Sequence, residues 1–66
     1  MKEKDIKKLE EYIESIEQLG ADSRWSLDFE NWGALYVKLN SVEYWARKGK
    51  VLAQKLQEEE ENEKTS

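Results

Sequence analysis

Residues 25–39 read WSLDFENWGALYVKL, and the hydrophobic period of this stretch decides between two folds. Alternate residues are apolar in two runs, at 25–30 and at 34–39: Trp25, Leu27 and Phe29 in the first, and Leu35, Val37 and Leu39 in the second. Such alternation is typical of a strand with one buried face. Gly33 lies between the runs, where a tight turn commonly needs a positive φ. The stretch therefore predicts a two-stranded antiparallel hairpin.

The segments on either side of this stretch have the period of a helix. Residues 3–19 predict an amphipathic helix, and Gly20 is suited to a left-handed cap at its end. A second helix is predicted from about residue 41 to 60, with Asn40 and Glu43 at the spacing of a capping box. Gly49 falls on its apolar stripe, which predicts close approach of another backbone. The two stripes are Ile6, Leu9, Ile13 and Ile16, then Val42, Trp45, Ala46, Gly49, Leu52, Ala53 and Leu56.

Together these elements predict one α+β domain of αββα order, formed by residues 1–60, in which both helices cover the same face of the hairpin. Residues 61–66 are expected to be a disordered acidic tail. The alternative is an all-α helical hairpin, because Trp25, Phe29 and Trp32 also have helical spacing, and 27–60 would then form one long helix. The poor helix formers Asn31, Gly33, Val37, Asn40 and Ser41 favour the strands.

The composition points away from catalysis. The 66 residues include no histidine and no cysteine, so the chain lacks the usual proton shuttle, thiol nucleophile and zinc ligands. No glycine-rich loop precedes a helix to hold a phosphate. We therefore expect a protein that is not an enzyme and has no cofactor or metal. Because so short a chain without disulfides has marginal stability, we also expect a homodimer, formed through the last helix or an edge of the hairpin.

The charge is unevenly distributed along the chain. The formal net charge is −4, and the excess of acid comes from Glu58–Glu61 and Glu63 near the C-terminus, so the remainder is close to neutral. The first residues are charged, and no apolar run reaches the length of a membrane span. The sequence thus predicts a cytoplasmic protein with no membrane partner.

Protein binding is the function that the sequence favours. Exposed tryptophan and tyrosine often anchor protein interfaces, and this chain has more large aromatic residues than a small core needs. In the αββα fold, Trp32 would lie at the turn and Tyr36 and Lys38 on the outer face of the hairpin, while Tyr44 would lie off the apolar stripe. We expect these four residues to bind a larger protein, with Trp32 as the anchor.

The alternative is a small nucleic-acid-binding protein that uses the basic part of the last helix. Four cations gather there beside aromatic side chains that could stack on bases: Arg47, Lys48, Lys50 and Lys55. Binding to phosphates depends on an excess of positive charge, which the chain as a whole does not have. Nucleic acid is therefore the less favoured partner.

In composition the chain resembles small accessory proteins of bacteriophages and mobile elements. It is short, rich in lysine, glutamate and aromatic residues, and free of cysteine, histidine and proline. The likeness covers no diagnostic motif. It implies a stoichiometric inhibitor or adaptor that acts on a larger protein.

Overall fold

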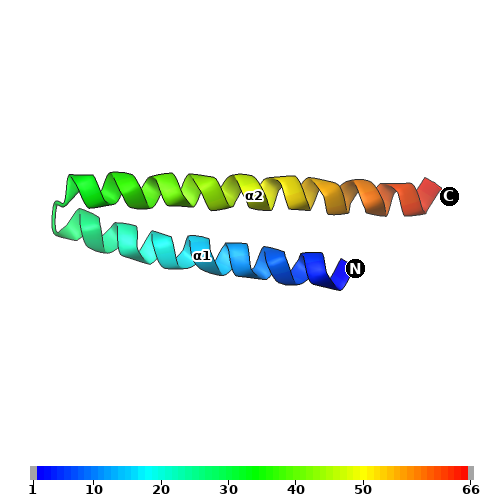
Figure 1. The fold of residues 1–66 in the computed structure, drawn as a ribbon, viewed down its shortest axis with the longest axis horizontal. Coiled ribbons are helices and arrows are strands. Elements are labelled where there is room, and N and C mark those ends of the chain that lie inside the picture. The colour runs from blue at the N-terminus through cyan, green and yellow to red at the C-terminus, as the bar shows by residue number, and fades with distance from the viewer. Residues whose placement is uncertain (1, 66) are drawn as a thin grey trace.

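The computed structural model describes the backbone of residues 2–65 and the side chains of residues 3–63, and it consists of two antiparallel helices. Helix α1 spans Lys2–Asp28 and helix α2 spans Trp32–Thr65, with 27 and 34 residues respectively. They lie side by side as a rod of 54 × 15 × 12 Å, with the connection at one end and both termini toward the other (Figure 1). The chain is a helical hairpin.

The predicted αββα fold is therefore wrong, and the all-α alternative is correct. The segments 25–30 and 34–39 form no strands: the first lies largely in α1 and the second wholly in α2. Gly20 does not end the first helix, and Asn40 does not begin the second, because both lie within helices. The helical periodicity at 3–19 and 41–60 is confirmed, but each helix extends well beyond it. Helix α2 also continues through residues 61–65, where the sequence leads us to expect a tail.

The turn between the helices explains why both extend so far. The amide of Asn31 donates to the carbonyl of Ser26 at 2.9 Å, and that of Glu30 donates to Leu27 at 2.9 Å. These two bonds form a Schellman motif, in which the residue at Glu30 adopts the left-handed conformation, with φ 54°. Asn31 then caps α2, since its Oδ1 accepts a hydrogen bond from the amide of Ala34 at 3.2 Å. Gly33, the predicted turn residue, has no positive φ.

The helices pack along a seam with the seven-residue repeat of a coiled coil. Most of the less exposed side chains of each helix fall in one row at alternating intervals of three and four residues, which keeps them facing the partner helix. On α1 these positions are Asp5, Leu9, Tyr12, Ile16, Leu19, Ser23 and Ser26; on α2 they are Leu35, Lys38, Val42, Trp45, Gly49, Leu52, Leu56 and Glu59.

Two ion pairs join the helices near opposite ends of the seam. Lys38 lies 3.8 Å from Asp22 close to the turn, and Lys55 lies 3.5 Å from Asp5 close to the N-terminus. Because the pairs are far apart along the rod, a shift of one helix along the other would break both. Their main role is therefore to fix the register of the hairpin, since ion pairs that stay partly open to solvent add little stability.

Two helices alone do not enclose a core. Among the described residues no apolar side chain is classed as buried, and the two buried residues are Ser23 and Ser26, with 7% and 6% of their surface exposed. Ser23 Oγ has no hydrogen-bond partner within the described part of the chain. The apolar side chains of the seam are shielded on one side only, so large apolar surfaces remain on both flanks of the rod.

Candidate protein-binding groove

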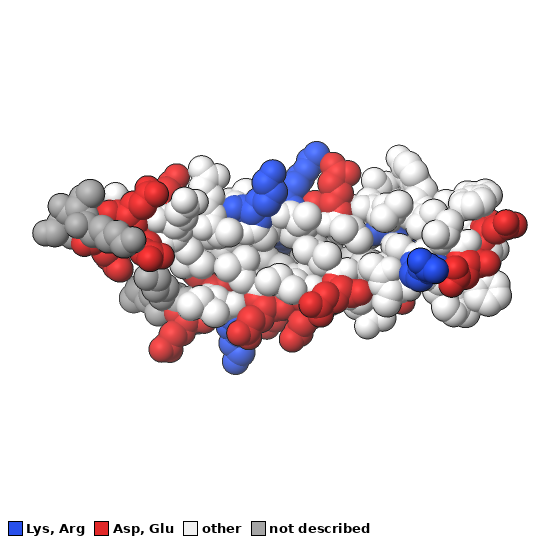
Figure 2. All heavy atoms as spheres, turned by 180° about the vertical axis from the view of Figure 1, so that it is seen from behind, with Lys and Arg blue, Asp and Glu red and all other residues white. Residues whose placement is uncertain are grey.

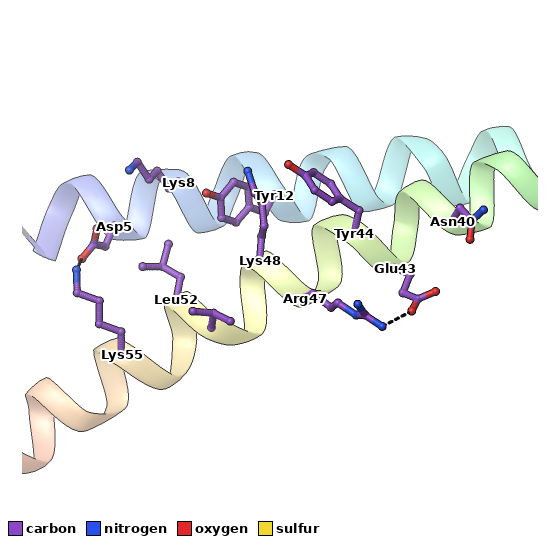
Figure 3. A pocket seen from close by; sticks show the side chains of 11 residues that line it. Asp5, Lys8, Tyr12, Asn40, Glu43, Tyr44, Arg47, Lys48, Leu52 and Lys55 are labelled. Carbon is purple, nitrogen blue, oxygen red and sulfur yellow. Dashed lines mark hydrogen bonds and ion pairs between the residues drawn. The ribbon is translucent and has the colours of Figure 1, made fainter.

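A groove with a volume of about 760 Å³ runs along one flank of the hairpin. We call it the tyrosine groove, because Tyr12 of α1 and Tyr44 of α2 lie on it (Figure 3). Val51 and Leu52 add apolar surface further along α2. The full lining is Asp5, Lys8, Tyr12, Asn40, Glu43, Tyr44, Arg47, Lys48, Val51, Leu52 and Lys55.

Both helices supply the aromatic part of this site. Trp45, on the seam, lies with its ring centroid 5.5 Å from that of Tyr12 and 5.2 Å from that of Tyr44. The second of these contacts is edge-to-face, a favourable geometry for aromatic pairs. Tyr44 thus stands against a fixed neighbour while 53% of its own surface stays exposed. This combination of rigidity and exposure is what an interface anchor requires.

Lys48 lies among these rings. Its ammonium nitrogen is 5.0 Å from the ring centroid of Tyr44, 5.5 Å from that of Trp45 and 5.9 Å from that of Tyr12. Such distances allow cation–π attraction. As a hydrogen-bond partner, the hydroxyl of Tyr44 raises the pKa of Lys48 further above its ordinary value. The ammonium of Lys48 is positively charged at neutral pH, as that of any exposed lysine is. The aromatic surface of the groove therefore carries a fixed positive charge.

The groove is positive although the whole chain is negative. Its lining has four cations, Lys8, Arg47, Lys48 and Lys55, and two carboxylates, which gives a local net charge of +2. Both carboxylates are paired: Glu43 accepts a bond from Arg47 at 2.7 Å, and Asp5 lies 3.5 Å from Lys55. Lys8 and Lys48 have no ion pair with any described residue. The groove thus offers apolar surface with two uncompensated positive charges.

The structure separates the four residues predicted to bind protein. Tyr44 lines the tyrosine groove. Lys38 lies on the seam and pairs with Asp22, so it is less available than the sequence suggests. Trp32 and Tyr36 are indeed exposed, at 61% and 69%, but neither lines the tyrosine groove, and Trp32 lies at the turn end of the rod.

The four cations proposed for nucleic acid are also divided. Arg47, Lys48 and Lys55 line the tyrosine groove, whereas Lys50 lines a different hollow on α2, beside Gln54 and Gln57. Arg47 and Lys55 are already engaged in the ion pairs described above. Only Lys48 combines an unpaired charge with the aromatic rings.

Sequence reasoning missed the contributions of α1 to the groove. Tyr12 and Lys8 lie within the helix predicted over residues 3–19, but the predicted αββα fold gives no reason to place them beside Tyr44. The signal that could have found them is the seven-residue repeat of the seam. In an antiparallel hairpin, that repeat places Tyr12 opposite Trp45.

Within the described residues, neither helix is long and apolar enough to cross a membrane. The same part of the chain holds no group of three or more residues able to ligate a metal ion. Comparisons with protein-family models, with curated proteins and with solved structures find no match to the chain. The geometry of the groove is therefore the basis for assigning a function.

Proposed function

We propose that the chain is a non-catalytic protein-binding module that holds an amphipathic helix of a larger protein in the tyrosine groove. The observation that carries this proposal is the aromatic and aliphatic surface formed by half-buried Tyr12 and exposed Tyr44 and Val51, which has uncompensated positive charge at its edge. A helix with an apolar face and acidic flanks matches both features. By binding such a helix in the groove, the module would keep it from its other contacts and so act as a stoichiometric inhibitor or adaptor.

Tyr44 is the expected anchor of the interface. It projects from α2 against Trp45, so little side-chain freedom is lost when a partner covers it. Lys48 is expected to contribute to partner specificity. An acidic side chain of the partner near the rings would pair with its charge, whereas a basic side chain would be repelled.

The proposal is tested with a display library of amphipathic helices, followed by anisotropy measurements on a labelled peptide from the selection. We expect the selected peptides to carry apolar residues at i, i+3, i+4 and i+7 and acidic residues beside them. Tyr44→Ala should weaken their binding by about tenfold or more, which corresponds to about 1.4 kcal/mol or more. The matched control is Tyr36→Ala, which removes a similarly exposed tyrosine outside the groove and should leave the affinity unchanged.

Two results would contradict the proposal. One is equal loss of affinity in the Tyr44→Ala and Tyr36→Ala variants. The other is selection of basic peptides, since the groove carries a local excess of positive charge. Circular dichroism of both variants shows whether each keeps the helix content of the unsubstituted chain.

Nucleic-acid binding remains the second candidate, and it is supported by Lys48 and Tyr44 together, a cation beside a ring that could stack on a base. Lys50→Glu distinguishes the two functions, because Lys50 lies outside the tyrosine groove. A labelled single-stranded oligonucleotide should lose affinity in this variant and show a steep dependence on salt. An acidic peptide in the groove should be insensitive to the same substitution.

A further inference from the structure

The flank of the hairpin opposite the tyrosine groove is apolar along most of its length. We call it the side face and define it by eight residues at seven-residue intervals, four on each helix: Ile6, Ile13, Gly20 and Leu27 on α1, and Trp32, Leu39, Ala46 and Ala53 on α2. Its five large apolar side chains are all exposed. Ile6 and Ala53 line one shallow hollow together, which shows that the two rows share a flank.

Figure 2 looks onto this face. An uncharged band runs between the helices. Asp and Glu predominate along the α1 border, whereas the α2 border carries Lys and Arg near its middle, with Asp or Glu beside them and toward its terminal end. We propose that a second copy of the chain covers the side face, so that two hairpins form a four-helix bundle with two-fold symmetry. The two-fold axis runs along the rod, which places both turns at the same end.

The arrangement of large and small residues supports a second copy as the occupant. Across the seam, contacting residue numbers add up to 58 for Leu9 and Gly49 and to 60 for Asp5 and Lys55. Two side-face residues therefore lie at the same level along the rod when their residue numbers add up to about 59. These pairs are Ile6 with Ala53, Ile13 with Ala46, Gly20 with Leu39, and Leu27 with Trp32.

Three of these four levels combine a large residue with a small one. At Gly20 an added Cβ would meet nothing within 4 Å, so the space beside this residue is open at the level of Leu39. A two-fold axis along the rod places α1 of one copy over α2 of the other, level by level. Ile13 then faces Ala46 of the second copy, and Leu39 faces its Gly20. Large side chains fill the spaces above small ones, as in a well-packed core.

The borders of the side face are complementary in the same arrangement. Glu10 of one copy comes to the level of Lys50 in the other, and Arg24 comes to the level of Tyr36. Glu17 comes to the level of Glu43, whose charge is already neutralised by Arg47 at 2.7 Å. A two-fold axis perpendicular to the rod would instead place the acidic border of α1 against the same acidic border in the second copy.

The missing core supports the same conclusion. No apolar side chain is classed as buried within the described residues, so the hairpin alone shields few of its large apolar groups from water. Closing the side face would give Leu9, Ile16 and Leu56 a second layer of neighbours. A four-helix bundle is the usual way for helices of this length to enclose a core.

Sedimentation velocity tests the proposal on the full chain. We expect a dimer of twice 7.9 kDa at high micromolar concentration. Ile13→Glu places a charge in the middle of the side face and should weaken dimerisation by roughly tenfold or more. Val51→Glu is the matched control, because Val51 is exposed on the opposite flank and its substitution should leave the dimer intact. A monomer at high concentration, or an equal effect of the two substitutions, overturns the proposal.

The orientation is tested separately. Because the chain has no cysteine, Asp28→Cys provides one labelling site next to the turn, outside the side face. Spin labels in the two copies should lie much closer together than the 54 Å length of the rod, since both turns are at the same end. Glu10→Lys and Lys50→Glu should each weaken the dimer, and the double variant should restore it. A label distance near the length of the rod, or no restoration, contradicts the arrangement.

Discussion

Glu30 is the residue at which the chain reverses direction, and it does so at a cost. With φ at 54° it occupies the left-handed region, which is unfavourable for a residue with a Cβ and which glycine commonly fills after a helix. The hydrogen bonds of the Schellman motif and the cap by Asn31 hold it there. The backbone at Glu30 is therefore strained, and this conformation allows the short connection between α1 and α2.

Replacing Glu30 with glycine should raise the free energy of unfolding by about 1 kcal/mol, because glycine adopts this conformation without strain. Asn31→Ala should lower it by about 1 kcal/mol, because the amide of Ala34 loses its capping oxygen. Urea denaturation followed by circular dichroism measures both changes. The explanation is contradicted if Glu30→Gly is neutral or destabilising.

Gly49 shows how closely the two helices approach each other. The sequence places it on an apolar stripe and predicts close approach of another backbone. The structure instead places a side-chain atom nearest: Leu9 Cδ2 lies 4.0 Å from where a Cβ would be. That distance is ordinary van der Waals contact, so one methyl group fits and a longer side chain does not. Glycine is therefore not required at this position by packing.

Gly49→Ala should stabilise the hairpin by about 0.5–1 kcal/mol, since alanine is the better helix former and the seam accommodates its methyl group. Gly49→Ile should destabilise it, because the larger side chain meets Leu9. Thermal unfolding of the two variants beside the unsubstituted chain measures the difference. Loss of stability in Gly49→Ala would show that the helices pack more tightly here.

The parts of the two helices far from the turn could be predicted from the sequence. Apolar residues recur there at helical spacing, from Ile6 to Leu19 and from Val42 to Leu56. Toward the turn, the seam continues with Ser23, Ser26 and Lys38, whose polar side chains hide the repeat. The apolar residues there happen to alternate, although Leu35 is the one of them that lies on the seam, and this alternation led to the prediction of strands. Glutamate in the left-handed conformation gives no signal at all, because glycine is the usual residue at that position.

The binding site was predicted only in part for the same reason. Tyr44 was identified from its position beside the apolar stripe, which depends on α2 alone. Tyr12 and Lys8 could be joined to it only once the fold was known to be two antiparallel helices. The ion pair between Lys38 and Asp22 likewise depends on the register between the helices, which no local pattern in either segment reveals.

At the scale of the whole molecule, the hairpin has a seam and two apolar flanks but no enclosed interior. If a second copy closes the side face, folding and association are linked, and stability depends on concentration. The midpoint of thermal unfolding should then rise by several degrees across a hundredfold increase in protein concentration. Ile13→Glu should have a lower midpoint that no longer depends on concentration. A constant midpoint for the unsubstituted chain would mean that the single hairpin is the folding unit.

The short connection also determines the order in which the hairpin can form. Only residues 29–31 separate the helices, so the first contacts beside the turn close a very small loop, whereas Asp5 and Lys55 meet across nearly the whole chain. Loop-closure entropy makes the distant contacts costly until the nearer ones are in place. We therefore expect the contacts between the helices to form in sequence from the turn toward the termini. Each contact that forms shortens the loop that the next contact must close. Unfolding starts at the other end, where the two chain termini separate first.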